Sequence, residues 1–382
     1  MKKILLVPLI ILVVSALIFS GCAAPAPAPE PKPAPAPSPE PKPAPLPTSP
    51  TKTIELKFAH QNPPTGRTTV KFLDAWAKKA EEATNGRIKI TMYPAQSLCK
   101  ANESIEATKG GVTDITWIIL GYFPGSFPLA EVISLPFLSI PSGKVDGRTL
   151  SGGAINSRIL QELYETFPEI QAEFADVKLL FLQATDPQNL ITTKKPVRNL
   201  NDLKGMKIRA LGGYPSEMFK MLGASPMLLS TPECYEAAAK GVIDGMRTGW
   251  AGIGTHRLYE VFNYWTEIPL LAAEFAVIMN KEKWDTLPPD IQEAIMSVSG
   301  IPGAEFAGDS AFGADVKEET LALIQKEGHT MEIIIPDPGE EERWKEIAGK
   351  PLWDQWVAER QGKGLPGQKV LDEALRLLAK YR

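Results

Sequence analysis

Arg209 is the residue of this sequence best suited to hold a small anion. It directly follows the apolar Ile208 in a predicted strand, Lys207–Ala210, and precedes a loop that begins at Gly212. A guanidinium at the end of a strand could face a cleft and grip a carboxylate through two parallel, charge-assisted hydrogen bonds. A surface salt bridge is the competing interpretation, which the local sequence alone favours.

Aromatic side chains gather beside other stretches that could form a cleft. They lie in or after predicted strands and comprise Trp117, Tyr122, Tyr214, Trp250 and Phe275. Such walls would suit a monocarboxylate with an apolar or aromatic body. Plain core packing would explain Trp117 and Phe275 equally well.

The three histidines form no recognisable catalytic or metal site. His60, His256 and His329 are far apart in the chain, and none belongs to an H-E-x-x-H or Cys/His motif. The sequence also has no P-loop and no G-x-S-x-G motif. We therefore predict a binding protein without catalytic residues, metal or cofactor. His60 and Gln61 lie at the carboxyl end of the first strand. They could contact a ligand or have an ordinary structural role in the loop.

The elements that would position these residues alternate between strand and helix. Ile54, Leu56 and Phe58 alternate with charged residues, an amphipathic helix runs from Val70 to Asn85-Gly86, and a second strand follows. This order predicts a βαβ unit with parallel strands. Further predicted strands are Val177–Leu182, Lys207–Ala210 and Phe275–Asn280, and further predicted helices are Ser216–Leu222, Thr231–Lys240, one opening at Pro288-Pro289-Asp290 and a C-terminal one through Val370–Leu378.

One short pattern occurs twice. A predicted helix ends at Lys109-Gly110-Gly111 before Val112–Ile115, and another ends at Lys240-Gly241 before Val242–Gly245. Glycine is common after any helix, so the match could be chance. The alternative interpretation is that two lobes reuse one structural element.

The N-terminus carries an export signal. Lys2-Lys3 precede an apolar run from Ile4 to Phe19, and Gly21-Cys22 follow. This ending resembles the lipobox of bacterial lipoproteins, which implies cleavage before Cys22 and its acylation. The run is short for a permanent membrane span, although an uncleaved signal anchor is the alternative. Residues 23–50 are mostly Pro and Ala, which favours an extended spacer.

Composition excludes some classes of protein. The chain has 382 residues, 44% apolar and 23% charged, with a net charge of −4, so a polyanion such as nucleic acid is not the expected partner. The length suffices for two core-forming lobes. Cys99 and Cys234 are the only cysteines after Cys22, so no dense disulfide framework supports the fold, and whether they pair stays open.

Several segments together resemble one protein family. In chain order they are Leu56–His60, Asn85–Ile90, Tyr93-Pro94, Leu135–Phe137, Asp202–Arg209, Glu217–Pro226 and Gly241–Gly245. They are similar to the landmarks of the solute-binding proteins of TRAP (tripartite ATP-independent periplasmic) transporters, the DctP-like family. The resemblance covers essentially everything after the spacer.

The resemblance implies an α/β, two-lobed, periplasmic-binding-protein-like fold (type II-like) with hinge-crossing strands and a long helix. It also implies that the lobes close around an organic acid whose carboxylate bonds Arg209, and that the closed form delivers the acid to a TRAP-type membrane permease. We also expect residues 1–21 to be the leader and residues 22–52 to be the lipid-anchored spacer. Lobe I should comprise residues 53–186 plus about 275–310, and lobe II residues 187–274 plus about 311–382.

The chain departs from the family pattern in two places. Where some members have D-G-Q-E-N-P, it reads Asp244-Gly245-Met246-Arg247-Thr248, so Met246 replaces the usual amide. Where some members have a second arginine, it has Asn189 after Gln188. We therefore expect Gln188, Asn189 and Met246 at the ligand and regard a second anionic group on the ligand as doubtful. Some relatives bind their acid through a metal ion, but no residue pattern here places one.

The predicted function is that of an extracytoplasmic, lipid-anchored receptor for a small organic acid. Three alternatives remain open on the sequence alone: the binding lipoprotein of an ATP-driven importer, a sensory binding protein, and a tethered extracytoplasmic enzyme. An enzyme would consume its ligand, whereas a receptor would release it unchanged.

Overall fold

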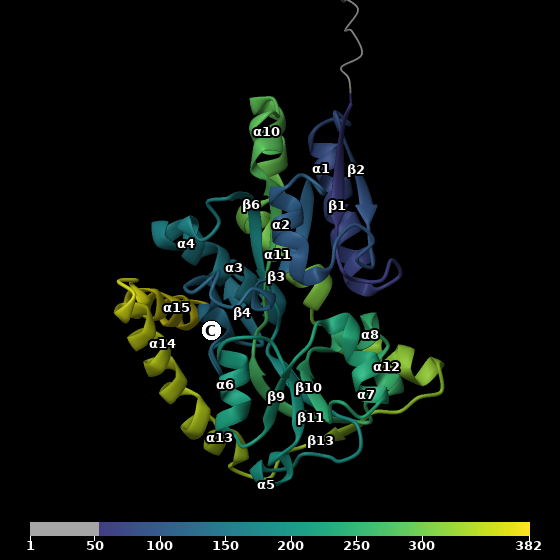
Figure 1. Ribbon diagram of the computed structural model, residues 1–382, viewed down its shortest axis with the longest axis vertical. Coiled ribbons are helices and arrows are strands. Elements are labelled where there is room, and N and C mark those ends of the chain that lie inside the picture. The colour runs from purple at the N-terminus through teal and green to yellow at the C-terminus, as the bar shows by residue number, and fades with distance from the viewer. Residues whose placement is uncertain (1–52) are drawn as a thin grey trace, which may run out of the picture. The chain divides into compact units, whose positions relative to one another are not determined.

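The computed structural model describes residues 53–382. The predicted leader, Cys22 and the spacer up to residue 52 lie outside the described residues. The described residues form one compact unit, in which two main sheets and a small hairpin are surrounded by helices (Figure 1). The α/β, two-sheet fold that the resemblance implies is confirmed.

The first sheet has five strands in the order β2-β1-β3-β12-β6. Its strands are β1 (Ile54–Ala59), β2 (Ile88–Tyr93), β3 (Ile115–Ile119), β6 (Val177–Ala184) and β12 (Glu274–Asn280). β1 is parallel to both β2 and β3, and β12 is antiparallel to both β3 and β6. The predicted βαβ unit is therefore confirmed. We call the part of the protein built on this sheet lobe I.

The second sheet has six strands in the order β13-β11-β7-β10-β8-β9. Its strands are β7 (Gln188–Thr192), β8 (Lys207–Ala210), β9 (Ser225–Leu228), β10 (Gly245–Thr248), β11 (Tyr264–Leu271) and β13 (Glu332–Ile334). A separate hairpin pairs β4 (Ser142–Val145) with β5 (Arg148–Ser151). We call the part built on the six-stranded sheet lobe II.

The two sheets repeat one topology. Read from its other edge, lobe II is β9-β8-β10-β7-β11, and each strand takes the place and the direction of one strand in β2-β1-β3-β12-β6. The pattern that occurs twice in the sequence marks this repeat. The carboxylate of Asp114 accepts the backbone N–H of Lys57, and the carboxylate of Asp244 accepts that of Lys207. The reuse of one element by two lobes is confirmed.

The chain passes between the lobes on two crossing strands. β6 of lobe I leads directly into β7 of lobe II, and β11 of lobe II leads directly into β12 of lobe I. The two connections are bonded to each other, since Thr185 N–H donates to the Ala273 carbonyl at 3.0 Å and Ala273 N–H donates to Thr185 Oγ1 at 3.0 Å. Such a pair of crossing strands is suited to act as a hinge.

Helices cover the sheets. They are α1 (Asp74–Ala83), α2 (Ser104–Lys109), α3 (Gly152–Thr166), α4 (Pro168–Ala172), α5 (Leu200–Leu203), α6 (Tyr214–Met221), α7 (Cys234–Ala239), α8 (Trp250–Thr255), α9 (Lys281–Asp285), α10 (Pro289–Ser297), α11 (Gly300–Phe312), α12 (Val316–Lys326), α13 (Glu340–Ala348), α14 (Lys350–Gly362) and α15 (Gly367–Tyr381). A π-helical turn, Thr68–Leu73, leads into α1. α11 packs on α3 and β6, and the chain then enters α12, which packs on α8.

The C-terminal helices depart from the expected division of the chain. α13 and α14 pack against α6 of lobe II, but α15 packs against α3 and β4. Figure 1 shows these three helices in yellow, following one another towards α3. α15 packs there because it buries its predicted apolar stripe, which includes Val370, Ala374 and Leu378. The end of the region expected in lobe II thus lies against lobe I.

One helix start was also expected one residue late. The sequence places Thr231 at the cap of the helix up to Lys240, whereas Ser230 is the N-cap in the structure. Ser230 and Glu233 form a capping box, and Ser230 N–H donates to the Glu233 carboxylate at 2.8 Å. Thr231 is thereby left free to turn its hydroxyl elsewhere. Cys99 and Cys234 are both free thiols.

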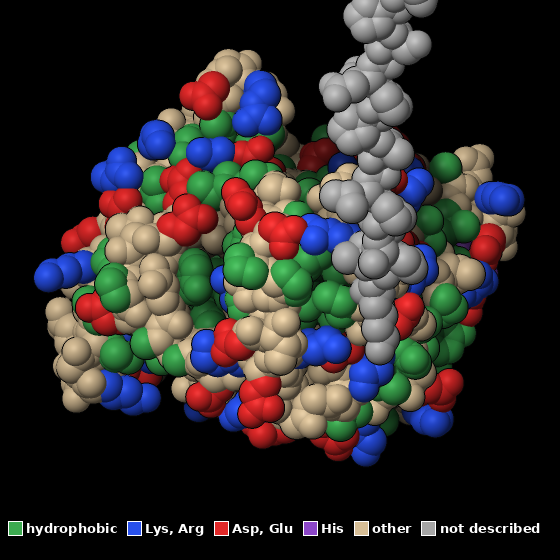
Figure 2. All heavy atoms as spheres, turned by 90° about the horizontal axis from the view of Figure 1, so that it is seen from above, with side chains coloured by type: hydrophobic (Ala, Val, Ile, Leu, Met, Phe, Trp, Pro, Cys, Tyr) green, Lys and Arg blue, Asp and Glu red, His purple; other side chains and the backbone are tan. Residues whose placement is uncertain are grey.

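Charged side chains of both signs cover the surface. On the face shown in Figure 2, Lys and Arg side chains alternate with Asp and Glu side chains, and apolar side chains are scattered between them. No helix among residues 53–382 is both long enough and apolar enough to cross a membrane.

Candidate ligand-binding site

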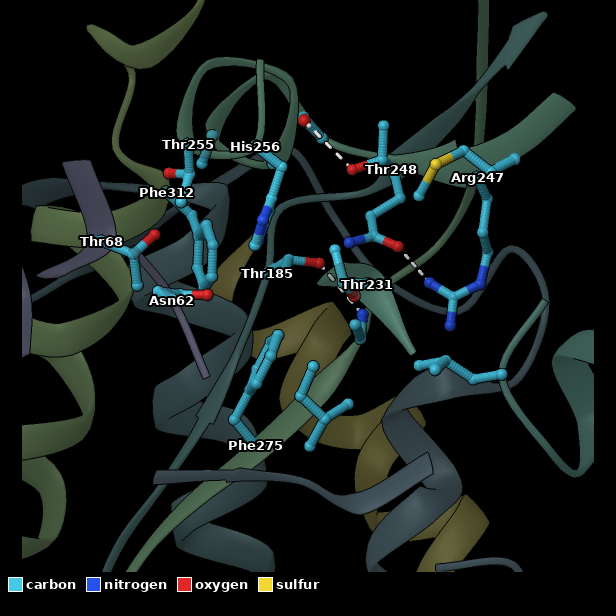
Figure 3. A pocket seen from close by; sticks show the side chains of 18 of the residues that line it. Asn62, Thr68, Thr185, Thr231, Arg247, Thr248, Thr255, His256, Phe275 and Phe312 are labelled. Atoms are coloured by element: carbon cyan, nitrogen blue, oxygen red, sulfur yellow. Dashed lines mark hydrogen bonds between the residues drawn. The ribbon is translucent and has the colours of Figure 1, made fainter. Parts of the chain in front are cut away.

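A small cavity lies between the two sheets and the crossing strands (Figure 3). Its volume is about 60 Å³. Its walls come from lobe I, from both crossing connections and from lobe II: Gln61, Asn62, Thr68, Trp117, Ile119, Phe275 and Phe312; Thr185, Gln188 and Ala273; Arg209, Leu211, Thr231, Met246, Arg247, Thr248, Gly249, Ala251, Gly252, Thr255 and His256. Many of these residues follow the carboxyl ends of β1, β8 and β10, where clefts form in α/β folds.

Arg247, in β10, is an almost completely buried cation with few partners. Its side chain is 1% exposed, and its Nη1 donates to the Gln188 side-chain oxygen. Its Nε and Nη2 are buried and have no hydrogen-bond partner in the described part of the chain. Burial lowers the pKa of Arg247 to about 9, against the opposing effect of Glu274. A buried guanidinium in this state is poorly compensated and is suited to receive an anion.

Arg209, in β8, is also buried, and two of its nitrogens donate to its own lobe. It is 4% exposed. Its Nε donates to the Leu229 carbonyl at 2.9 Å, and its Nη2 donates to Thr231 Oγ1 at 3.0 Å. Arg209 therefore contributes positive charge to the cavity while holding the segment that precedes α7.

Aromatic rings form one wall of the cavity. Phe275 of β12 stacks on Trp117 of β3, with ring centroids 4.8 Å apart and planes 7° from parallel. Phe312, at the end of α11, stacks on Phe275 at 5.6 Å. The Trp117 indole N–H donates to the buried Gln183 side chain at 2.9 Å, which fixes the ring. This wall offers a flat apolar surface to a planar or apolar group.

His256 adds a neutral polar group. It lies directly after α8, and its side chain points into the space between Phe312 and Thr248 (Figure 3). Burial, assisted by the charge of Arg209, lowers the pKa of His256 to about 4. The ring is therefore uncharged at neutral pH and can both donate and accept one hydrogen bond. It adds no charge to the cavity.

The charge of the lining is positive. It contains Arg209 and Arg247, and none of the described residues that line the cavity is Asp or Glu. The nearest acid in electrostatic terms is Glu274, which is 3% exposed and does not line the cavity. Burial raises the pKa of Glu274 to about 7, against the opposing effect of Arg247. An anion with an apolar body would compensate this site best.

The size of the cavity bears on how a ligand enters. A dry cavity of about 150 Å³ can hold a benzene ring. At about 60 Å³, the cavity must widen before it can take an aromatic acid. Its walls come from both lobes, so a small rotation at the crossing strands would supply that room.

The structure brings six of the predicted site residues to the cavity: Arg209, Gln61, Trp117, Gln188, Met246 and Phe275. His60 is next to this group. It is 3% exposed, and neither ring nitrogen has a partner in the described chain. Burial lowers the pKa of His60 to about 4.

Five predicted residues lie outside the lining, His60 and four others. Tyr214 faces α14, where its hydroxyl donates to Glu359 at 2.8 Å. Trp250 stacks on Trp265 at 4.2 Å and, with Asn189, lines a separate groove of about 720 Å³. Tyr122 lines a third hollow, and its hydroxyl bonds Thr231, which lines the cavity. These residues do not line the cavity, and their contacts with a ligand stay predictions. An aromatic residue near a strand end can face a cleft or the core, and the sequence does not distinguish the two.

Arg247, His256 and Phe312 line the cavity but were not predicted. Arg247 stands next to Met246, inside the segment that departs from the family pattern. In the structure it is the charged residue of a strand whose four residues are all buried. The second arginine that some family members have is absent at Asn189, and the second arginine of this cavity comes from β10. His256 and Phe312 follow or end helices, and nothing in their local sequence marks them.

Within residues 53–382 no group of three His, Cys, Asp or Glu side chains is arranged to hold a metal ion.

Comparisons with known proteins agree with this geometry. The family model described as bacterial extracellular solute-binding protein, family 7 (DctP), matches residues 58–360. The C4-dicarboxylate-binding periplasmic protein DctP of Rhodobacter capsulatus is 27% identical over 316 residues, which cover 81% of this chain and 88% of that protein.

Two solved structures are similar over most of the chain. One is a TRAP solute-binding protein of Rhodoferax ferrireducens in complex with copurified benzoate, at 28% identity, with a TM-score of 0.77 and coverage of 86% of this chain and 98% of that one. The other is a marine-metagenome TRAP solute-binding protein described as specific for aromatic acid ligands, in complex with metahydroxyphenylacetate. It shares 29% identity, with a TM-score of 0.77 and coverage of 86% and 99%.

Proposed function

The chain belongs to the DctP family of TRAP transporter solute-binding proteins, and we propose that it is a receptor for aromatic monocarboxylates. Members of this family bind solutes outside the cytoplasm and do not catalyse reactions.

The observation that carries the ligand proposal is the combination of charge and shape in one cavity. Two buried guanidinium groups and no acidic residue among the described lining favour an anion. The stack of Trp117, Phe275 and Phe312 favours a flat apolar body next to that anion. A benzoate-like acid has both features.

The similar solved structures support the same class. Their ligands are benzoate and metahydroxyphenylacetate, which combine one carboxylate with one aromatic ring. The similar R. capsulatus protein is named for a C4-dicarboxylate, so the family alone does not fix the ligand. The aromatic wall of this chain is what favours an aryl acid over an aliphatic diacid.

Delivery would follow from closure of the lobes. A ligand that contacts both lobes stabilises the closed state, and a membrane permease of the TRAP type would recognise that state. The partner follows from family membership. No chemistry on the ligand is needed, so the acid would be released unchanged.

We further propose that Cys22 is acylated and anchors the receptor to the outer side of the cell membrane. The small residue before Cys22 and the Pro- and Ala-rich stretch after it support this proposal. Expression with a radiolabelled fatty acid should label the wild-type chain and not the Cys22→Ser chain, which should appear in the soluble fraction. Label on the Cys22→Ser chain would refute the anchor.

A thermal-shift screen tests the ligand class. The secreted chain with Cys22→Ser is heated with benzoate, 3-hydroxybenzoate, phenylacetate, pyruvate, lactate or succinate. A ligand bound only by the folded state stabilises it by about 2.7 kcal/mol at a 100-fold excess over Kd, which raises Tm by several degrees. We expect the aryl acids to raise Tm and succinate to leave it unchanged. A shift with pyruvate or lactate alone would instead identify a small aliphatic acid, which the small cavity could also accept.

A further inference from the structure

Arg247 lines the cavity with two donors that the protein does not use. Its Nη1 donates to the side chain of Gln188, which lies at the start of β7 on a crossing connection. Its Nε and Nη2 are buried and have no partner in the described chain. Among the described lining residues, Thr255 is the only other one with a buried side-chain polar atom that lacks a partner. A ligand that fills the cavity should therefore bring an oxygen to Arg247.

Arg209 and Arg247 reach the cavity from opposite faces of the second sheet. Where β8 pairs with β10, Arg209 lies opposite Met246, so these two side chains leave the sheet on the same face. Arg247 is the next residue of β10, and its side chain leaves on the other face. The protein partners agree, since Arg209 donates to the segment before α7 and Arg247 donates to the start of β7. The two guanidinium groups are thus placed to meet two different groups of one ligand.

Arg209 keeps donors for the carboxylate. Its Nε donates to the Leu229 carbonyl and its Nη2 to Thr231 Oγ1, while its Nη1 donates to no atom of residues 53–382. Nη1 and Nη2 each carry two N–H groups, and together they form an edge that matches the two oxygens of a carboxylate. Arg209 can therefore hold the carboxylate, as the family resemblance implies, and keep both protein partners. Arg247 is then available for a second oxygen.

The walls of the cavity show where on the ligand that oxygen lies. The rings of Trp117, Phe275 and Phe312 come from lobe I, whereas both arginines come from lobe II. Figure 3 shows Phe275 and Phe312 on one side of the cavity and Arg247 on another. A ligand whose ring packs on the aromatic wall points its polar end at lobe II, so both oxygen-bearing groups belong to that end. An oxygen on the carbon next to the carboxylate meets this condition, and an oxygen on the far side of the ring does not.

The second oxygen should be uncharged. Glu274 is 3% exposed and interacts electrostatically with Arg247, although it does not line the cavity. A carboxylate there offsets part of the charge of Arg247 before any ligand binds. A hydroxyl or keto oxygen accepts hydrogen bonds from Nε and Nη2 without burying another negative charge beside Glu274.

We propose that Arg247 is a specificity-determining residue that selects aryl acids with a hydroxyl or keto oxygen on the carbon next to the carboxylate. Mandelate and phenylglyoxylate are simple acids of this class. The inference rests on the proposed function as a receptor for aromatic monocarboxylates and narrows its ligand class. It gives the departure from the family pattern at Arg247 a role in ligand choice.

Isothermal titration calorimetry with mandelate and phenylacetate tests the role of Arg247, because these acids differ by one hydroxyl group. Hydrogen bonds to a charged group are strong, so wild type should prefer mandelate by about 10- to 150-fold. Arg247→Met should lose this preference. Arg209→Lys should weaken both acids alike and keep it. Arg198→Met, which removes a half-exposed cation of lobe II that does not line the cavity, should also keep it.

A second variant guards against a folding defect. Removing one member of a buried charge pair can destabilise a protein, because the other charge is left alone. The double variant Arg247→Met, Glu274→Gln leaves neither charge in place. Its thermal melt shows that it folds, and it should lose the mandelate preference as completely as Arg247→Met.

Two further ligands test the position and the charge of the second oxygen. 3-Hydroxyphenylacetate carries its hydroxyl on the ring, and phenylmalonate carries a second carboxylate next to the first. If the affinity for either depends on Arg247 more than the affinity for mandelate does, the inference is overturned. An unchanged mandelate-to-phenylacetate ratio in both Arg247 variants also overturns it, while the receptor function stands. If wild type binds neither mandelate nor any acid of the thermal-shift screen, the proposed function itself fails.

Discussion

The hydroxyl of Tyr122 accepts the backbone N–H of Thr231 at 2.7 Å and lies 2.9 Å from the Thr231 hydroxyl. Tyr122 follows β3 in lobe I, and Thr231 precedes α7 in lobe II, so these bonds join the lobes. Thr231 is also the residue to which Arg209 donates. The contact that closes the lobes is therefore bonded to an arginine of the cavity.

Tyr122→Phe should loosen the closed state. It removes the hydroxyl and leaves the ring, so the lobes lose two hydrogen bonds and little packing. Each buried hydrogen bond contributes about 0.5–1.5 kcal/mol, so the loss of both predicts an affinity for the acid lower by about 5- to 150-fold. Titration calorimetry would measure the affinity, and small-angle X-ray scattering would show a larger radius of gyration with ligand present.

Tyr235→Phe is the matched control for this change. The Tyr235 hydroxyl donates to Glu260 at 2.6 Å, and both residues belong to lobe II. This variant also loses one tyrosine hydroxyl bond but none between lobes, so its ligand affinity should equal that of wild type. Equal loss of affinity in both variants would show that Tyr122 has no special part in closure.

Gly212→Ala should hinder closure of the lobes by a steric clash. Gly212 N–H donates to the Gly121 carbonyl across the lobes at 3.2 Å, and a Cβ at Gly212 would lie 2.5 Å from Cγ of Pro124 in lobe I. Overpacking costs about 1–3 kcal/mol, and here the clash disappears when the lobes move apart, so the cost falls on the closed state. Ligand affinity should fall by about 10-fold while the Tm without ligand changes little. Gly362→Ala, where a Cβ meets nothing within 4 Å, should change neither.

Much of the fold was predictable because its signals are local. The alternation in β1 and the apolar spacing in α1 depend on neighbouring residues, and the pattern after Gly111 and Gly241 repeats because both glycines have positive φ at a helix end. These features located the repeated element of both lobes. The packing of α15 on α3 was not predictable, since an apolar stripe does not show which helix or sheet will cover it.

The site was predictable only in part, because a cavity is made by residues far apart in the chain. Arg209 was predicted because it lies near the end of a predicted strand, and Phe275 because it lies within one. Trp250 has the same sequence signal, yet it stacks on Trp265 outside the cavity. Arg247 was missed because its place in the cavity depends on contacts that the local sequence does not show, such as its bond to Gln188.

Phe275→Leu should remove the preference for aromatic acids. The ring of Phe275 lies between Trp117 and Phe312, and a leucine keeps an apolar wall without a flat face. Aromatic pairs contribute about 0.5–1.5 kcal/mol beyond burial, so benzoate affinity should fall by about 2- to 10-fold more than the affinity for an aliphatic monocarboxylate. Calorimetric titrations with both ligands would measure the difference.

Phe174→Leu is the control for the aromatic wall. Phe174 stacks on Phe127 at 4.8 Å, and neither residue lines the cavity. Its replacement should lower stability by a similar amount and leave the ratio of the two affinities unchanged. A change of that ratio in the Phe174→Leu protein would mean that the Phe275 effect reflects general loosening of lobe I.

Glu274→Gln should reduce the pH dependence of stability. Burial raises the pKa of Glu274 from 4.5 to about 7, so between these values the folded state binds more protons than the unfolded state. The stabilising contribution of the proton is therefore complete below about pH 4.5 and is lost as pH rises through about 7, a change of about 3 kcal/mol at most. The neutral amide cannot ionise, so this loss should be absent in the variant.

Denaturant unfolding between about pH 5 and about pH 8 would measure this effect. Burial also raises the pKa values of Glu173 and Asp186 to about 7, so wild type and Glu274→Gln should both lose stability as pH rises. The slope of the variant should be smaller by up to one proton. Glu217→Gln, at an exposed position of α6, should keep the wild-type slope. Parallel slopes for wild type and Glu274→Gln would show that Glu274 is ionised beside Arg247 throughout this range, and the cavity would then carry a compensating negative charge before any acid binds.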